Sequence, residues 1–331
     1  MYQTVLITGA GGFIGSHVVE KQLSLGREVR AVDLHLDRIS DISHPALRRI
    51  QGNFADPAVQ QEAIPGAEVV IHLASAHLEV SLPEETYWQV NVHSLAGFLQ
   101  ACRDHGVQRF VQVSSSGVYG AIKEPPADEE SPCHPELLYE RTKYQGELEV
   151  KRFYQETGFP VVIVRPAWVY GPGCPRTGKL FRSIAKNRFF FVGDGMALRH
   201  CVYIDDFVDA LELAATTERA VGRTYIIGDE APTTLENLVS EIARITNASV
   251  PRFHAPVWLM AAVGLLMEAA FFPLRKEPPI SRRTLRFFQG NSAFDISRAK
   301  RELGFVPKYD VSTGLRAYAQ RSRIGSIGGA K

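Results

Sequence analysis

The sequence predicts an α/β fold built on a doubly wound parallel sheet, with a second, smaller lobe. Short apolar runs alternate with helical stretches through the first half of the chain, which is the pattern of repeated strand-helix units. A glycine-rich turn joins the first run to the first helical stretch, as it does in the Rossmann arrangement. The length of 331 residues is large for one domain and sufficient for two.

Five apolar runs are typical of buried parallel strands because they are nearly continuous. They cover residues 5–7, 29–32, 69–73, 110–113 and 161–164. Helical stretches are expected over residues 14–25, 57–64, 87–105 and 138–157. The loops that follow the carboxyl ends of such strands meet along one edge of the sheet. We therefore expect one site from the residues at these ends: Gly9, Asp33, Leu73, Ser114 and Arg165.

The second half of the chain is less regular. Helices are expected over 205–215 and 235–246, with a strand over 225–227 between them, and 278–315 mixes short helices with polar loops. We assign 1–170 and 201–229 to the sheet domain, 171–200 and 230–320 to the smaller lobe, and 321–331 to a flexible tail.

The glycine-rich turn predicts a dinucleotide site. Its glycines let backbone amide groups and a helix N-terminus approach a pyrophosphate, because no Cβ blocks the way. A strand precedes the turn and an amphipathic helix follows it, which is the context such a site needs. The residues of the turn expected to bind the cofactor are Gly9, Gly12, Phe13, Ile14 and Gly15.

Asp33, at the end of the next strand, favours NAD over NADP. A carboxylate there accepts hydrogen bonds from the ribose hydroxyls and repels a 2′-phosphate. Arg38 could instead receive that phosphate. Asp56 could contact the adenine, or could cap the helix that begins at Pro57. The remaining residues predicted to bind the cofactor are Asn53, Phe54, Leu73, Ala74, Ser75, Arg165 and Pro166.

Tyr139 and Lys143 predict the chemistry. Residues four apart in a helix share one face. A phenol is a poor base near neutral pH because its reference pKa is about 10, and a nearby ammonium lowers that pKa towards the working range. A tuned phenol together with a dinucleotide site implies proton transfer coupled to hydride transfer.

On these motifs the chain resembles the extended short-chain dehydrogenases/reductases, of the NAD-dependent epimerase/dehydratase and 3β-hydroxysteroid dehydrogenase kind. The matching stretches are 8–15, 72–74, 115–120, 139–143, 165–173 and 199–206. The resemblance implies that Tyr139 is the general acid/base and that Ser115 hydrogen-bonds the substrate oxygen. It also implies that Lys143 lowers the pKa of the phenol and binds the nicotinamide ribose. Ser114 and Ser116 are the alternatives to Ser115, and Ser116 is also expected to contact substrate.

Departures from the family pattern narrow the reaction. Dehydratases of this family carry acidic residues just after the serine, where this chain has Ser116 and Gly117. Without a second carboxylate to protonate a leaving hydroxyl, dehydration is not expected. The chain also lacks the loop cysteine of the family's epimerase-reductases. The expected reaction is hydride transfer at a secondary alcohol, which is released as a ketone or reduced again on the opposite face.

Trp168 and Arg199 point to different substrates. Sugar-nucleotide members of the family have asparagine at the position of Trp168, whereas the preceding Arg-Pro-Ala is similar to the steroid branch. That likeness implies an apolar ring substrate such as a 3β-hydroxysteroid or a carboxysterol. Arg199 matches an arginine that sugar-nucleotide enzymes use on the diphosphate, which favours a UDP-glucose 4-epimerase-like activity. Trp168 as a plain core residue and a non-catalytic NAD-binding protein remain alternatives.

Composition limits the partners. Lys and Arg (37) nearly cancel Asp and Glu (36), so no global field recruits nucleic acid, and a small-molecule substrate is expected. The four cysteines are widely spread, which argues against a metal site or a disulfide framework. Met1 leads into a strand pattern without a signal peptide, so a cytoplasmic location is expected.

Two apolar surfaces predict further contacts. The run over 255–267 predicts a helix that covers the core or a pocket. The alternative is a peripheral membrane contact through 255–276. The helices over 87–105 and 138–157 carry more apolar surface than one covered face requires, and family members pair through the equivalent helices. A homodimer built as a four-helix bundle is therefore expected.

Overall fold

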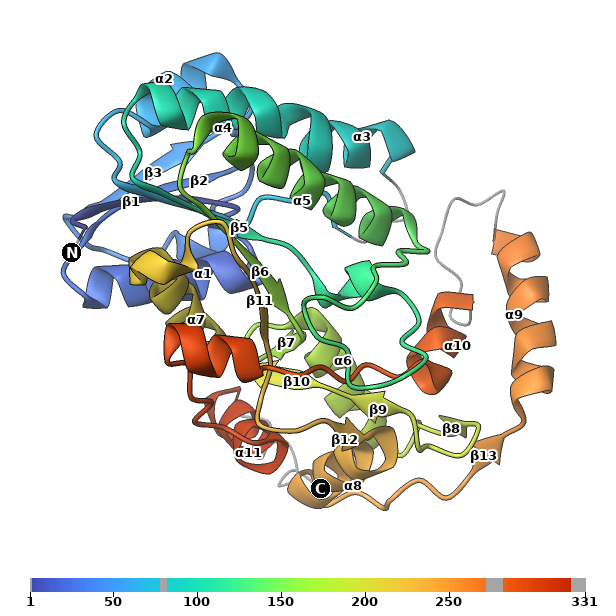
Figure 1. The fold of residues 1–331 in the computed structure, drawn as a ribbon. Helices are drawn as coiled ribbons and strands as arrows, with labels where there is room; N and C mark the ends of the chain where they lie inside the picture. The colour runs from blue at the N-terminus through green and yellow to red at the C-terminus, as the bar shows by residue number, and fades with distance from the viewer. Residues whose placement is uncertain (1, 78–81, 272–281, 323–331) are drawn as a thin grey trace.

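The computed structural model describes residues 2–77, 82–271 and 282–322, with the side chains of Arg282 and Arg283 excepted. Within these residues the predicted fold is confirmed. A seven-stranded sheet with the order β11-β6-β5-β4-β1-β2-β3 carries helices on both faces (Figure 1), and all its pairs are parallel. The strands are β1 (Thr4–Thr8), β2 (Glu28–Asp33), β3 (Leu47–Gln51), β4 (Val69–His72), β5 (Arg109–Val113), β6 (Val161–Pro166) and β11 (Thr224–Ile227).

The sheet is buried on both faces. In β1, Val5 and Ile7 belong to the core shared with α1 (Phe13–Ser24) and α7 (Ile204–Thr216). Leu6 belongs to the opposite core, shared with α4 (Ser94–Asp104) and α5 (Leu138–Thr157). Successive side chains of a strand point to opposite faces, so a strand covered on both sides needs the continuous apolar runs seen in the sequence.

The helix expected over 87–105 contains an irregular turn. It begins as α3 (Glu84–Trp88), passes through a π-helical turn (Gln89–His93) and continues as α4. Such turns often occur at functional sites, and this one carries the buried Asn91. The short helix after β3 is α2 (Pro57–Ala63).

Short strand pairs join distant segments outside the seven-stranded sheet. The pairs are β7 (Trp168–Tyr170) with β10 (Cys201–Tyr203), β8 (Phe191–Val192) with β13 (His254–Ala255), and β9 (Leu198–Arg199) with β12 (Thr233–Thr234). The helices around them are α6 (Pro175–Ala185), α8 (Leu235–Ile245), α10 (Arg282–Gln289) and α11 (Val311–Arg321). The domain limits expected from the sequence stay a prediction.

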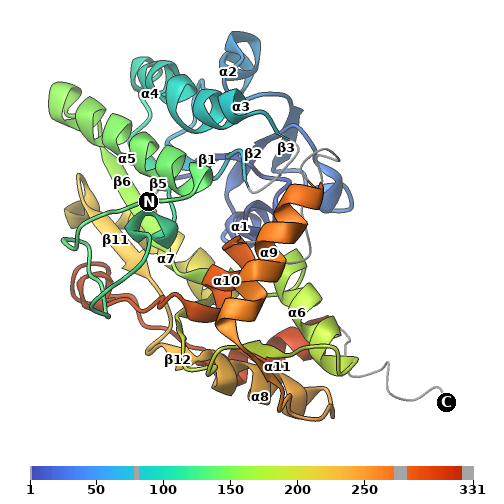
Figure 2. The same ribbon diagram turned by 90° about the vertical axis from the view of Figure 1, so that its right-hand side faces the viewer.

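The apolar run forms α9 (Val257–Phe271), which lies along the outside of α10 (Figures 1 and 2). Residues 272–276 of the expected membrane segment lie outside the described residues, as do 278–281 and residues 323–331 of the expected tail. In the described ranges no helix combines the length and the hydropathy needed to span a bilayer.

Candidate active site

The glycine-rich turn brings β1, α1 and the loop after β4 into close contact. Gly9 has a left-handed φ of 72°. A Cβ on Gly9 would lie 2.6 Å from the backbone nitrogen of Ala74, and one on Gly15 would lie 2.0 Å from the Gly9 carbonyl oxygen. No other residue fits these positions without moving the backbone.

Gly11 was missed in the sequence, although it stands in the same glycine run. A Cβ there would lie 1.8 Å from the carbonyl oxygen of His35. The Gly11 N–H donates to Asp33 Oδ2 at 2.9 Å, and the N–H of His35 donates to Oδ1 at 3.1 Å. The carboxylate that is expected to hold the ribose is therefore fixed against the turn by two backbone donors.

The N-terminus of α1 is open. Gly12 occupies the N-cap position, and among the described residues no side chain caps the helix. The first-turn N–H groups, including those of Phe13 and Ile14, therefore form a positive helix end without a side-chain acceptor, which fits a pyrophosphate. Arg38 lies nearby: its Nη1 is 2.9 Å from where a Cβ on Gly173 would be.

Three predicted residues after β3 turn their side chains elsewhere. Asn53 accepts from the N–H of Ala55, and Phe54 is buried against His72 and Phe98. Any cofactor contact by the buried Phe54 would therefore use the backbone, whereas the exposed Asn53 keeps its Nδ2 for a ligand. Asp56 is the N-cap of α2 and accepts from the N–H of Ala58 at 2.9 Å, so its capping interpretation is the one that the geometry supports.

Asn91, which the sequence reasoning also missed, ties the loop after β4 to the catalytic helix. Its Oδ1 accepts from the Ser75 hydroxyl and from the Ala76 N–H, while its Nδ2 donates to the Ala76 carbonyl and to Thr142 Oγ1. The predicted residues Leu73 and Ala74 lie in this loop. Thr142 precedes Lys143, so the amide fixes the cofactor-side loop relative to the predicted catalytic residues.

Ser115 is the serine that lies close to Tyr139. The Ser115 hydroxyl lies close enough to the Tyr139 phenol to lower its pKa, and Ser115 Oγ accepts from the Gly117 N–H at 3.1 Å. Ser114 is buried and its hydroxyl has no partner in the described part of the chain, whereas Ser116 begins a 3₁₀ turn. Ser115 and Tyr139 thus meet as the sequence predicted.

The electrostatics of the phenol differ from the expectation. Burial raises the pKa of Tyr139 to about 12, opposed by the hydrogen bond with Ser115 and by the charge of Arg176 at the start of α6. Lys143 is buried and its Nζ donates to the Val113 carbonyl at 2.7 Å; burial lowers the pKa of this amine to about 8. The predicted net lowering of the phenol pKa is therefore absent here, because desolvation outweighs the nearby cations.

The N-terminus of α5 is fixed by Glu140. Its Oε2 accepts from the N–H groups of Glu136 and Leu137, each at 3.1 Å. Arg286 of α10 donates to the same oxygen at 3.1 Å. A helix of the smaller lobe is thus bonded to the residue that follows Tyr139.

Arg165 is buried in β6, where it bonds to residues next to the site. Its guanidinium forms a buried ion pair with Glu147, with Nη2 2.6 Å from Oε2, and Nη1 donates to the Tyr119 hydroxyl at 2.7 Å. The predicted cofactor contact of Arg165 therefore cannot use this side chain. Pro166 ends β6, where backbone groups could still reach a ligand.

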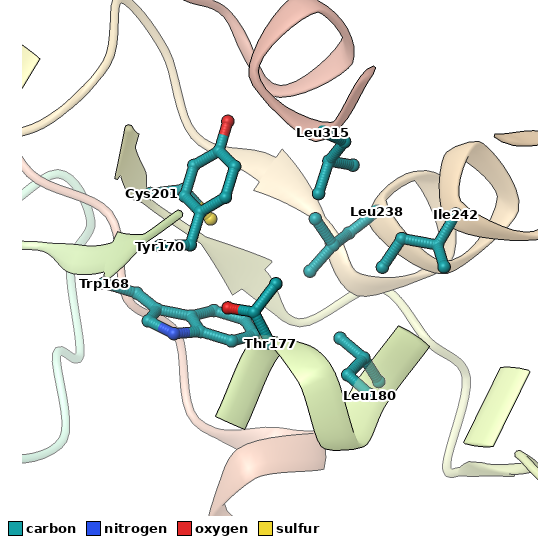
Figure 3. Close-up of a pocket in the computed structure, with 8 residues that line it drawn as sticks. All are labelled: Trp168, Tyr170, Thr177, Leu180, Cys201, Leu238, Ile242 and Leu315. Atoms are coloured by element: carbon teal, nitrogen blue, oxygen red, sulfur yellow. The ribbon is translucent and has the colours of Figure 1, made fainter. Parts of the chain in front are cut away.

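Trp168 contributes to an apolar pocket outside the seven-stranded sheet (Figure 3). The lining residues are Trp168, Tyr170, Thr177, Leu180, Cys201, Leu238, Ile242 and Leu315. The indole packs edge-on against Phe287 of α10, with ring centroids 5.9 Å apart. Trp168 Nε1 and Thr177 Oγ1 are buried without a hydrogen-bond partner among the described residues. Two polar groups in a mostly apolar pocket thus remain unsatisfied.

Arg199 is a buried cation that no carboxylate of the described residues pairs with. Its Nη1 donates to the carbonyls of Leu198 and Gly290, and its guanidinium lies 4.9 Å from the Phe287 ring centroid. Nε and Nη2 have no partner, and no carboxylate pairs with Arg199 in the described ranges. Burial lowers the pKa of Arg199 to about 10, so it remains charged at neutral pH. An unpaired buried charge is costly, and an anionic ligand would remove that cost.

Comparison with known proteins identifies the family of the chain. The profile of the NAD dependent epimerase/dehydratase family matches residues 5–228. A dTDP-glucose 4,6-dehydratase from Streptomyces griseus is 31% identical over 95% of this chain and 92% of its own length. Sterol demethylase protein B from Methylococcus capsulatus is 30% identical over 92% of this chain and 94% of its own length. The solved structure of MoeE5 in complex with UDP-glucuronic acid and NAD has a TM-score of 0.78 and 26% identity, and the match covers 97% of this chain and 99% of that one.

Proposed function

The chain belongs to the NAD dependent epimerase/dehydratase family, and within it we propose a dehydrogenase of an apolar ring alcohol that also carries an anionic group, as a carboxysterol does. One observation carries this proposal: the Phe287 ring touches both Trp168 and Arg199. An apolar wall and an unpaired cation therefore lie side by side. A carboxylated sterol offers a partner to each.

The residues that would hold NAD lie at the ends of the sheet strands, at the glycine-rich turn after β1, at the end of β2 and at the start of α5. The open end of α1 would hold the pyrophosphate, Asp33 would accept from the ribose hydroxyls, and Lys143 would donate to the nicotinamide ribose. NAD, the cofactor of this family, supplies the hydride acceptor when bound.

Ser115 and Tyr139 would hold the reacting oxygen. The Tyr139 phenolate would accept the hydroxyl proton as the alcohol carbon gives up a hydride to bound NAD, which leaves a ketone. The charge of Arg176 favours the phenolate, against the burial that raises the pKa of Tyr139 to about 12. The Lys143 ammonium, one helical turn away, would act in the same direction as Arg176. The Ser115 hydroxyl donates to the substrate oxygen and orients it.

The arrangement disfavours dehydration. Glu140 is the carboxylate beside Gly117: its Cγ is 3.1 Å from where a Cβ on Gly117 would lie. One of its oxygens already accepts from two backbone N–H groups and from Arg286. A carboxylate held as an acceptor is a poor source of the proton that a leaving hydroxyl needs.

Helix α10 relates the two halves of the proposed reaction site. Arg286 bonds to Glu140, next to Tyr139, while the following residue, Phe287, contacts Trp168 and Arg199. Consecutive residues of one helix thus connect the start of the catalytic helix with the proposed substrate contacts.

A sugar-nucleotide 4-epimerase is the second candidate, and Arg199 favours it. A diphosphate would satisfy the free Nε and Nη2 as well as a carboxylate would. Trp168 opposes it, because an indole at this position supplies apolar area rather than hydrogen bonds to a diphosphate.

Matched substrates and two variants separate these candidates. We expect Arg199→Gln to lower kcat/KM for a carboxysterol by about tenfold or more. For the same sterol without the carboxylate, kcat/KM should change little. Trp168→Asn should weaken both sterols. Arg48→Gln, at an exposed site on β3, is the control. The epimerase replaces this proposal if Trp168→Asn keeps its affinity for the true substrate while Arg199→Gln loses that affinity.

We also propose a homodimer through α4 and α5. Gly97 is exposed with nothing near it, and Leu148 is an exposed apolar side chain on α5. Pairing with a second copy would bury these surfaces in a four-helix bundle. Light scattering at micromolar concentration should give twice the chain mass, and Leu148→Glu should shift it towards the monomer.

A further inference from the structure

Helix α9 has an exposed face without a single polar residue. Trp258 and Leu266 are each 72% exposed and Leu265 is 58% exposed. The complete face consists of Trp258, Leu259, Ala262, Leu265, Leu266, Ala269 and Ala270. These positions recur at helical spacing, and the exposed side of a surface helix normally carries charged residues instead. A contiguous apolar patch of this kind marks an interaction site.

The opposite face attaches α9 to the protein. Met260 and Gly264 are its buried residues. Met260 packs in a small cluster with Leu285 of α10 and with Val192 and Ala255 of the short strands. Both views place α9 at the outside of the molecule, with α10 behind it (Figures 1 and 2). The apolar face is therefore not a part of the protein core.

Cations gather where α9 begins. The segments 186–194 and 249–256 run side by side, because Phe191 N–H donates to the Phe253 carbonyl and Ser249 bonds to Asn187. They carry Lys186, Arg188 and Arg252, all exposed, against the single carboxylate of Asp194. Phe253, 66% exposed, lies between these cations and the helix.

This combination fits the surface of an anionic bilayer. An interfacial helix buries an apolar face at the boundary of the acyl chains, with cations at the level of the headgroups and tryptophan at the interface. Its length of 15 residues corresponds to about 22 Å, enough to lie in the surface. A protein interface buries about 800 Å² on each partner, which is more than one convex helix flank with three alanines supplies.

We propose that α9 docks this protein on an anionic lipid bilayer, with Trp258, Leu265 and Leu266 inserted below the headgroups. Helix α10, directly behind the docked helix, carries Phe287 against Trp168 and Arg199. Docking therefore brings the substrate-binding side of the site to the membrane. Entry of an apolar substrate from the lipid rests on the proposed function. The docking of α9 on the bilayer does not depend on that function.

Flotation with lipid vesicles tests the docking. The full-length protein should float with vesicles of phosphatidylcholine and phosphatidylglycerol, and less with phosphatidylcholine alone. Leu265→Glu combined with Leu266→Glu should lower the partition coefficient by at least about tenfold. Arg188→Gln combined with Arg252→Gln should lower it by about tenfold on the anionic vesicles. Val306→Glu, at a site 69% exposed outside α9, is the matched control and should bind as the wild type does.

Folding is checked in each variant by thermal unfolding and NAD binding, and Trp258→Glu replaces the double variant if that variant does not fold. Tyr139→Phe should float normally, so a failure of the proposed chemistry and a failure of docking are distinguishable. The proposal is overturned if the wild type floats with neither vesicle, or if the leucine variants float as well as the wild type. A different result would assign the apolar face to a second copy of the chain and would also overturn the proposal. In that result the wild type does not bind the vesicles, and the oligomer mass in solution is lower for the leucine variants than for the wild type.

Discussion

The cofactor side and the substrate side of the site differ in how completely the protein satisfies its own polar groups. On the cofactor side, Asp33 accepts from two backbone donors and Lys143 donates to a backbone carbonyl. On the substrate side, Trp168 Nε1, Thr177 Oγ1 and two nitrogens of Arg199 are buried without partners among the described residues. Buried polar groups are usually paired. The protein thus pairs these groups of the proposed cofactor side itself, whereas it leaves these groups of the proposed substrate side unpaired among the described residues.

The largest effect is expected from Tyr139→Phe, which keeps the ring and removes the proton relay. Turnover should fall by about 10² or more, because general acid-base catalysis supplies a factor of that size. NAD affinity should stay within about twofold, since the cofactor side is built by other residues. Steady-state kinetics and NAD titration measure the two quantities. Retained turnover would contradict the assignment of the phenol.

The buried amine of Lys143 predicts a pH-dependent stability. Its folded-state pKa of about 8 lies below the ordinary 10.5, so the folded protein releases this proton first as pH rises. Wild-type stability is therefore reduced below pH 8, and the reduction disappears between about pH 8 and 10.5. Lys143→Met removes this penalty, so its free energy of unfolding should rise relative to that of the wild type. This difference should be larger at pH 7 than at pH 10.5 by up to about 3 kcal/mol. Denaturant unfolding of both proteins at both pH values would show it, and a constant difference would speak against it.

Gly15→Ala tests whether the cofactor side is as rigid as its geometry indicates. The added Cβ would lie 2.0 Å from the Gly9 carbonyl oxygen, so α1 must move at a cost of about 2 kcal/mol. NAD affinity should fall by about tenfold or more. Gly97→Ala adds the same methyl group to α4 with nothing within 4 Å of the new Cβ. It is the control for cofactor binding and should leave NAD affinity unchanged. Equal NAD affinity in both variants would show a tolerant turn.

The smallest effect is expected from Asp56→Ala. Loss of the N-cap of α2 should lower the free energy of unfolding by about 1 kcal/mol, with NAD affinity unchanged because the carboxylate caps the helix. Thermal unfolding and NAD titration measure the two effects. The reverse result, weaker NAD binding at equal stability, would return Asp56 to the adenine site.

The sequence predicted where the elements of the proposed cofactor side lie, because local rules govern them. Helix α5 has the predicted ends, and the glycine turn, Asp33 and the Ser115–Tyr139 pair lie where strand ends converge. Gly11 and Asn91 were missed because their roles depend on His35 and on the loop after β4, which are distant in sequence. The π turn was missed because its period differs little from that of a regular helix.

The substrate side was harder because tertiary contacts create it. Two-residue strands such as β9 and β12 have no sequence signature of their own. The meeting of Trp168 and Arg199 on Phe287 joins three segments that only the fold brings together. The spacing of Tyr139 and Lys143 predicted the pair but not the desolvation that raises the pKa of the phenol.

The central claim is that the incomplete substrate side takes an apolar alcohol with an anionic group. The most direct measurement is NADH formation by the wild-type protein with a panel of carboxysterols, unmodified 3β-hydroxysterols and UDP-sugars. We predict the highest kcat/KM for a carboxysterol, a lower value for the same sterol without the carboxylate, and no net NADH from the UDP-sugars. Interconversion of UDP-sugars at the C4 position, with no turnover of any sterol, would contradict the claim.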